Sequence, residues 1–167
     1  MDDATTIVNL MDDKIAKYLY QVPYPYRIED AFNFIQSSYE DFKLHKAITF
    51  AIDYKYKSNL LLVGTIGIKD IDYANKKADI GYWIGKQYQG KGIATECVKL
   101  VVNYAFDELK LKEISAHVFP NNNSSIRVLE KNGFEKTKEI VNEYHPISKG
   151  YKNSLVYIIK NKMSVSS

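Results

Sequence analysis

The spacing of apolar residues changes about a quarter of the way along the chain. Residues 9–20 carry apolar side chains at roughly helical intervals, and a second helix is predicted to open at Glu29 and Asp30. From about Ala47 apolar and polar residues alternate, which predicts a half-buried strand, and residues 60–68 form a nearly continuous apolar run typical of a strand covered on both faces. The expected apolar stripe of the second helix consists of Phe32, Ile35, Tyr39 and Phe42.

The second half of the chain is predicted to run strand, helix, strand, helix, strand, strand. A polar turn at residues 70–77 precedes these elements, and a loop holding Glu143 and His145 separates the last two strands. This order predicts an α/β (α+β) fold in which a mixed sheet has helices on both faces. The six elements span residues 78–85, 93–109, 113–119, 125–132, 134–142 and 151–160.

Length and composition suit one soluble domain over residues 1–167, with a frayed tail from about residue 161. Hydrophobic residues make up 46% and charged residues 26%, which are ordinary values. The net charge of +3 is too mild to indicate nucleic-acid binding, because basic and acidic residues are interspersed. No apolar run reaches the roughly 18 residues of a membrane span, and the acidic start is no signal peptide, so we expect a cytoplasmic protein.

Cys97 is the single cysteine, so the chain has no pair for an internal disulfide. Its helical context favours a buried, inert thiol over a redox or nucleophilic one. No set of residues has the spacing of a metal site, and we expect no metal.

A glycine pair, Gly90 and Gly92, marks the passage from the strand at 78–85 into the longest predicted helix. Glycine lets a ligand approach the backbone closely, and the first N–H groups of a helix have no internal partner. Together these features predict an anion site suited to phosphate. A Walker loop is excluded because Lys91 lies between the glycines, and a dinucleotide fingerprint is weak because Thr95 occupies its third position. A tight turn without a ligand stays open at this point.

Three stretches around the turn resemble the GNAT superfamily of acetyl-CoA-dependent N-acetyltransferases, in its RimJ/RimL-like branch. Gln87, Gly90 and Gly92 match the Gln/Arg-x-x-Gly-x-Gly/Ala loop of the family. Residues 78–84 look like the fourth strand of that branch. Residues 122–134 look like its Asn-x-x-Ser…Leu-Glu-Lys-x-Gly-Phe segment. Residues 22–31 also fit, so the resemblance covers about residues 10–160. Family members usually begin with a strand, which here is short, absent or formed by residues 4–8.

The resemblance implies a mostly antiparallel sheet whose fourth and fifth strands splay apart after a bulged stretch at residues 80–85. Acetyl-CoA would place its pantetheine arm in that gap and its pyrophosphate on the glycine turn. Lys91, Arg127 and Lys131 are either phosphate partners or solvated cations. The expected cofactor-binding residues are Tyr82, Trp83, Ile84, Gln89, Gly90, Lys91, Gly92, Ile93, Ala94, Asn122 and Ser125.

The expected catalytic residues are Asp79, as the base, and Ser125, as the proton donor. Asp79 lies where the branch often has a glutamate, and it is either a base acting through a water or a surface carboxylate. His117 is a second candidate base, or a hydrogen-bonded structural histidine. Many family members carry a tyrosine acid where this chain has Leu129, and Ser125 is the natural substitute, as well as a potential helix cap.

The expected acceptor is a primary amine, with a protein N-terminal α-amine favoured. An α-amine has a pKa of about 7.7–8.0, so part of it is neutral near pH 7, whereas a lysine amine at about 10.4 needs a stronger base. A small-molecule amine, a non-catalytic CoA-binding module and a subunit completed by a partner or in a homodimer remain alternatives. The pocket is expected under the loop at residues 20–27, shaped by Tyr24, Tyr26, Tyr82 and Trp83.

Overall fold

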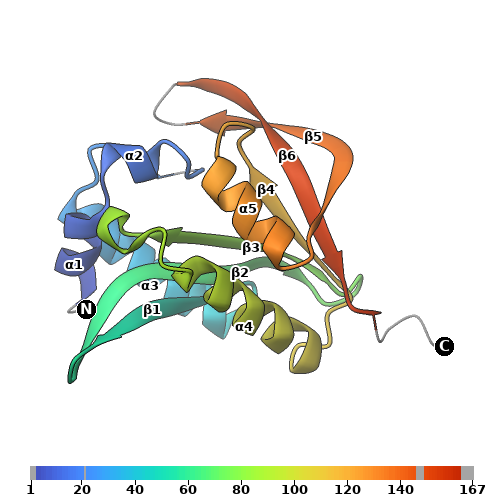
Figure 1. The fold of residues 1–167 in the computed structure, drawn as a ribbon, viewed down its shortest axis with the longest axis horizontal. Helices are drawn as coiled ribbons and strands as arrows, with labels where there is room; N and C mark the ends of the chain where they lie inside the picture. The colour runs from blue at the N-terminus through green and yellow to red at the C-terminus, as the bar shows by residue number, and fades with distance from the viewer. Residues whose placement is uncertain (1–2, 21, 146–148, 163–167) are drawn as a thin grey trace.

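The computed structural model describes residues 3–20, 22–145 and 149–162. Within these residues six strands form one sheet, in the spatial order β1-β2-β3-β4-β6-β5 (Figure 1). All neighbouring strands are antiparallel except β3 and β4. The tail predicted beyond residue 162 lies outside the described residues. The strands are β1 (Ile48–Tyr56), β2 (Asn59–Asp72), β3 (Lys77–Ile84), β4 (Glu113–Val118), β5 (Glu135–His145) and β6 (Gly150–Lys160).

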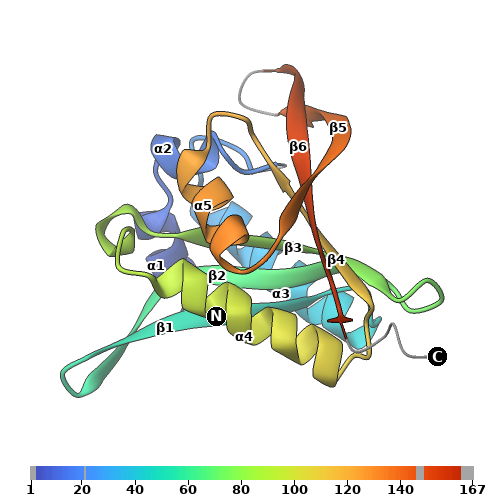
Figure 2. The same cartoon turned by 45° about the vertical axis from the view of Figure 1, so that its right-hand side comes forward.

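Helices cover both faces of the sheet, as the order of elements predicts. One face carries α4 and α5, and the other carries α1 and α3 (Figure 2). Neighbouring strand residues point to opposite faces, and accordingly Leu61 packs into the core with α4 while Leu62 packs with α1 and α3. The helices are α1 (Asp3–Leu10), α2 (Asp13–Ala16), α3 (Ile28–Lys43), α4 (Ile93–Asp107) and α5 (Asn123–Lys131), with a 3₁₀ turn at Lys86–Tyr88.

The larger core lies between the sheet and α4. Residues 63–68 of β2 are all buried, which confirms a strand covered on both faces over that part of the expected 60–68 run, whereas Leu60 is 67% exposed. Val98 of α4, Ile68 of β2 and Ile114 of β4 are fully shielded from solvent and belong to one cluster. This core fixes the start of α4 against the strands that flank the predicted site.

Among the described residues the N-terminal segment has no strand, which is one of the three alternatives expected, and its helices differ from the prediction. Residues 4–8 lie in helix α1 and not in a strand, because Ala4 and Ile7 bury one helical face. The helix expected over residues 9–20 is broken after Leu10, and a short helix restarts where the Asp12 carboxylate accepts a hydrogen bond from the N–H of Ile15 at 2.9 Å. Within residues 3–20 and 22–47 no strand precedes β1, so β1 forms an edge of the sheet.

The helix α3 is correctly predicted, but its buried face is not. Phe32, Tyr39 and Phe42 are 41%, 64% and 56% exposed, so three of the four residues of the expected stripe face solvent and only Ile35 packs inward. The helix instead approaches α1 through Ala31, which is fully buried and small enough to allow close contact, with Ile35 beside it. The prediction was based on hydrophobicity, which favours burial of the large aromatic side chains over burial of Ala31.

Two strands run further than predicted, because pairing continues across residues that look like turns. β2 extends to Asp72, which pairs with Lys77. β5 extends to His145, which pairs with Gly150, so residues 143 and 145 lie in a strand and not in a loop.

The parallel pair β3–β4 is short, and it opens the centre of the sheet. Only residues 77–79 of β3 pair with residues 113–115 of β4. Beyond Asp79, β3 stays with β2 as far as Ile84, while β4 follows β6 as far as Val118. This confirms the splayed central pair. The expected bulge at residues 80–85 is wrong, because the β2–β3 register is unbroken from Asp79 to Ile84.

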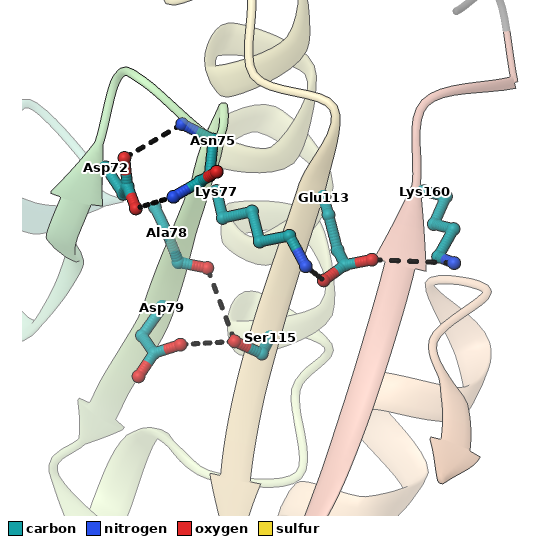
Figure 3. A network of polar contacts seen from close by, with 8 residues as sticks. All are labelled: Asp72, Asn75, Lys77, Ala78, Asp79, Glu113, Ser115 and Lys160. Carbon is teal, nitrogen blue, oxygen red and sulfur yellow. Dashed lines mark hydrogen bonds and ion pairs between the residues drawn. The ribbon is translucent and has the colours of Figure 1, made fainter. Parts of the chain in front are cut away.

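Charged residues hold the closed end of this pair together. The Glu113 carboxylate lies 2.8 Å from the Lys77 ammonium and 3.5 Å from that of Lys160, which links β3, β4 and β6 (Figure 3). The hydrogen bond from Lys77 is the main reason that the pKa of Glu113 lies below its usual range. The strands therefore diverge from a fixed point.

Candidate functional site

The glycine turn is held in a defined conformation between β3 and α4. Gly90 has φ of 76° and Gly92 has φ of 81°, values that side chains disfavour. The side-chain amide of Gln89 donates to the carbonyl of Ile84 at 2.8 Å, which ties the turn back to the end of β3. Helix α4 then begins at Ile93, with Gly92 as its N-cap.

The turn presents a row of free backbone donors. Among the described residues, the N–H groups of residues 90–94 have no acceptor. A Cβ at Gly90 or Gly92 would meet no atom within 4 Å, so this surface is open to a ligand. The N–H of Gln89 bonds to the carbonyl of Lys86 at 3.2 Å, and Gln89 thus supports the turn and does not extend the row. Such a row at a helix N-terminus binds phosphate oxygens.

Side chains of both charges line a cavity of about 460 Å³ beside the turn. Lys91 and Lys131 are its cations, whereas Arg127 does not line it. The Lys91 ammonium lies 5.7 Å from the ring of Tyr54 and 5.4 Å from that of Tyr88, which is within cation–π range. The full lining is Ile52, Asp53, Lys91, Gly92, Ile93, Thr95, Glu96, Cys97 and Lys131.

Cys97 lies in this lining and is half-buried, not fully buried as expected. Burial, with a smaller contribution from Glu96, raises its pKa. A raised pKa lowers the thiolate fraction, and the thiolate is the reactive form. This agrees with an inert role for Cys97.

The splayed section of β3 is an edge inside the sheet. On its β4 side, residues 80–84 have no strand partner among the described residues. Unpaired strand N–H and C=O groups are a template for any extended chain that carries amides. Of the predicted contacts, Trp83 packs its ring into the N-terminal core, so only its backbone faces the opening. The carbonyl of Ile84 is already bonded to Gln89.

Asp79 lies where this opening begins. The Ser115 hydroxyl donates to Asp79 Oδ1 (Figure 3). Oδ2 lies 3.9 Å from Nε2 of His117, two residues further along β4. The Asp79 side chain is 32% exposed and that of His117 is 24% exposed. The structure thus brings together the two candidate bases and adds Ser115, which only the β3–β4 register reveals.

Lys69 adds a cation to the same face. It is paired directly across from Asp79 on β2, and opposed residues in an antiparallel pair share a face. Its Cε and Nζ lie 3.2 Å and 3.3 Å from where a Cβ of Gly81 would sit, so the side chain leans over β3 toward the opening. Nothing in the sequence pattern distinguishes Lys69 from the other lysines.

Ser125 lies on the opposite face, in the first turn of α5. Asp79 and Tyr82 are three residues apart on one strand, so their side chains point to opposite faces. The Tyr82 hydroxyl is 2.9 Å from Ser125 Oγ. Asn122 caps the helix by accepting from the Ser125 N–H at 3.3 Å, so the predicted capping role belongs to Asn122. The structure does not bring Asp79 and Ser125 into contact.

The loop at residues 20–27 reaches the end of β4. The ring centroids of Tyr20 and Phe119 are 4.5 Å apart, and the Lys152 ammonium lies 5.6 Å from the Phe119 ring. Tyr26 packs into the N-terminal core, where burial raises its pKa to about 12, while Tyr24 is 47% exposed. Tyr20 was not among the residues expected to shape the pocket.

Two larger-scale features complete the description. No helix within the described part of the chain is long and apolar enough to span a membrane. Nor do three or more His, Cys, Asp or Glu side chains among these residues gather closely enough to hold a metal ion.

Comparison with known proteins places these features in a family context. A family model described as an acetyltransferase (GNAT) domain matches residues 1–135. The uncharacterized N-acetyltransferase p20 of Bacillus licheniformis is 33% identical over 138 residues, 81% of this chain and 75% of that protein. The probable N-acetyltransferase YjcK of Bacillus subtilis is 54% identical over 76 residues, 45% of this chain and only 42% of that protein. The spermidine N(1)-acetyltransferase of Escherichia coli K12 is 30% identical over 92 residues, 55% of this chain and 49% of that protein.

Solved structures show the same fold. The microcin C7 self-immunity acetyltransferase MccE, in complex with acetyl-CoA and AMP, superposes with a TM-score of 0.81 at 25% identity, over 96% of this chain and 88% of that one. Mycobacterium smegmatis RimJ, in complex with CoA-disulfide, superposes with a TM-score of 0.84 at 18% identity, over 99% and 80%. The second likeness shows the fold alone.

Proposed function

The chain belongs to the GNAT family of acetyltransferase domains, and on that premise we propose that it transfers the acetyl group of acetyl-CoA to a protein N-terminal α-amine, in the manner of the RimJ/RimL-like branch. The observation that carries this proposal is the continuity of two features. The free donors of the glycine turn follow the unpaired edge of β3 after one short 3₁₀ turn. A phosphate-bearing molecule with an amide-bearing arm fits both at once.

The chain's own residues supply binding at two levels. The N–H groups at residues 90–94 would hold the pyrophosphate, and each hydrogen bond to a charged group is worth about 1.5–3 kcal/mol. Lys91 and Lys131 would offset the remaining charge. The free edge at residues 80–84 would pair with the arm and direct the thioester toward Asp79.

For acetyl transfer, the protein must accept a proton from the amine and stabilise the negative charge that develops on the carbonyl oxygen. Acetyl-CoA supplies an activated carbonyl; a C–N bond forms, the C–S bond breaks and the amine loses a proton. Asp79, held by Ser115 and beside His117, would receive that proton through a water. Backbone N–H groups at residues 82–84 would stabilise the negative charge on the carbonyl oxygen.

The charge near Asp79 supports an α-amine over a polycation. Lys69 leans toward the opening on the Asp79 face, so an acceptor with several positive charges meets a like charge there. Similarity to the spermidine N(1)-acetyltransferase supports a polyamine as the second candidate acceptor. Position 129 supports a third reading, a CoA-binding module without catalysis, since the buried Leu129 cannot donate a proton.

Thiol release from acetyl-CoA, measured across peptides with free N-termini, polyamines and free amino acids, tests the proposal. We expect the highest kcat/KM with a peptide N-terminus and no turnover when that terminus is blocked. Turnover of polyamines alone would replace the acceptor but keep the reaction. Tight CoA binding without transfer to any amine would establish the non-catalytic reading instead.

Changing Lys69 to Glu should shift acceptor preference toward polyamines. A unit charge at close range contributes about 1 kcal/mol in water-like surroundings, which is about fivefold per charge. Because Lys69→Glu changes the charge by two units, we expect the ratio of kcat/KM for spermidine to that for a neutral peptide to rise about 25-fold, and less at high salt. Lys99→Glu makes the same charge change on the exposed face of α4 and should leave the ratio unchanged. An equal shift in both variants would exclude a local effect of Lys69.

A further inference from the structure

We propose that Tyr82 is a positioning residue whose hydroxyl donates to Ser125 Oγ and so directs the hydrogen of Ser125 toward the sulfur that leaves during acetyl transfer. This inference rests on the proposed function. It assigns to Tyr82 a role through its side chain, in addition to the backbone contact expected of β3.

The Tyr82–Ser125 contact spans the opening in the sheet. Tyr82 lies on the section of β3 that has left β4, and Ser125 lies in the helix that follows β4. The 2.9 Å contact between their hydroxyl oxygens therefore joins the two sides of the opening on the α4–α5 face. A thioester held along the edge of β3 would lie beside this pair.

At 2.9 Å either of the two hydroxyls can be the donor, and the proposal assigns that role to Tyr82. Tyr82 has two acceptors within range, Ser125 Oγ at 2.9 Å and the Ser125 carbonyl at 3.4 Å, and the shorter distance is the favourable one. Burial raises the pKa of Tyr82 to about 12, so the phenol keeps its proton throughout the working pH range. When Tyr82 donates to Oγ, the serine hydrogen must point elsewhere, and a hydroxyl that accepts one hydrogen bond donates a stronger one.

The proton balance favours hydrogen bonding over proton transfer from Tyr82. When the C–S bond breaks, the sulfur keeps the electron pair. An ordinary thiol has a pKa of about 8.5, well below that of Tyr82, so the thiolate does not deprotonate the phenol. The Ser125 hydroxyl stabilises the thiolate by a hydrogen bond, and the proton released by the amine leaves on the Asp79 side.

The Tyr82–Ser125 pair also supplies a hydrogen-bond donor that position 129 lacks. The side chain of Leu129, one turn further along α5, is 1% exposed and carries no donor. Within the described part of the chain, Ser125 is the α5 residue whose hydroxyl contacts a strand, whereas the exposed Ser124 donates to Asn122 at 3.0 Å.

Kinetics of Tyr82→Phe, Ser125→Ala and the double variant test this assignment. We expect kcat to fall about tenfold in Tyr82→Phe and at least as far in Ser125→Ala, with little change in KM for acetyl-CoA. The double variant should match Ser125→Ala, because Tyr82 acts only through Ser125. The matched control is Tyr104→Phe, which removes a phenol hydroxyl from a ring packed edge-on against Phe50, away from the opening. Additive losses in the double variant would overturn the proposal.

A second readout requires no turnover. With ¹³Cζ-labelled tyrosine, the Tyr82 resonance is assigned by its absence in Tyr82→Phe. We expect Ser125→Ala to shift this resonance and to raise the pKa of Tyr82, because Ser125 is its hydrogen-bond partner. An unchanged resonance means no hydrogen bond and contradicts the inference. If this shift occurs but no amine is acetylated, the proposed function fails while the hydroxyl pair stands, and the role at sulfur is then rejected.

Discussion

Replacing Gly92 with valine is expected to abolish CoA binding. Gly92 has φ of 81°, a conformation that costs an L-residue about 1–2 kcal/mol and a β-branched residue more. The side chain would also project into the open space in front of the donor row, where a Cβ at present meets nothing within 4 Å. We expect a loss of at least a hundredfold in CoA affinity, measured by calorimetry, with the fold retained.

Gly133 offers a matched control for backbone strain. It has the same φ of 81° but follows the end of α5, and a Cβ there would make only ordinary contact, at 3.9 Å from Ile159. Gly133→Ala and Gly92→Ala should therefore lose similar stability in thermal unfolding, and only Gly92→Ala should lose CoA affinity. Unchanged CoA affinity in Gly92→Val would remove the glycine turn from the binding site.

Asp79→Asn should have the largest effect on turnover. The amide keeps an oxygen that accepts from Ser115 but removes the charge that would take up the amine proton. General acid–base catalysis contributes about 10²–10⁴-fold, so we expect kcat to fall at least a hundredfold with CoA affinity unchanged. Asp72→Asn removes a carboxylate from the neighbouring turn, where it accepts from Asn75, and should leave kcat unchanged (Figure 3).

His117→Gln separates two versions of this step. If Asp79 is the base, the histidine variant should keep most of its activity. If His117 takes the proton and Asp79 orients it, both variants should fall equally far. Activity within about twofold of wild type in both would exclude this cluster as the source of the base.

The sequence predicted local structure correctly where a residue type favours a single structural role. Glycine at positions 90 and 92 predicted a turn between a strand and a helix, and the structure has that turn between β3 and α4. The long apolar run of β2 predicted burial on both faces. By contrast, the prediction of the buried face of α3 was wrong for its three aromatic residues, because close packing against α1 places the small Ala31 at the contact.

The sequence predicted single residues of the candidate site, but it did not predict which side chains contact one another. Asp79 and Ser125 were each expected to be catalytic, yet they lie on opposite faces of the sheet, and each has a partner that residue spacing does not reveal. Ser115 meets Asp79 through the β3–β4 register, and Tyr82 meets Ser125 across the opening of the sheet. Such contacts depend on long-range register, which spacing along the chain does not encode.

The sequence by itself determined most helices and strands from α3 onward, the place of the glycine turn and, through its motifs, the family. These properties depend on local periodicity and backbone freedom, which a few neighbouring residues set. Only the tertiary structure decided where β3 leaves β4, which side chains meet there and which cation leans over the opening. Those facts arise because residues distant in the chain are aligned by strand pairing, and shifting a strand by one residue would turn each side chain to the other face.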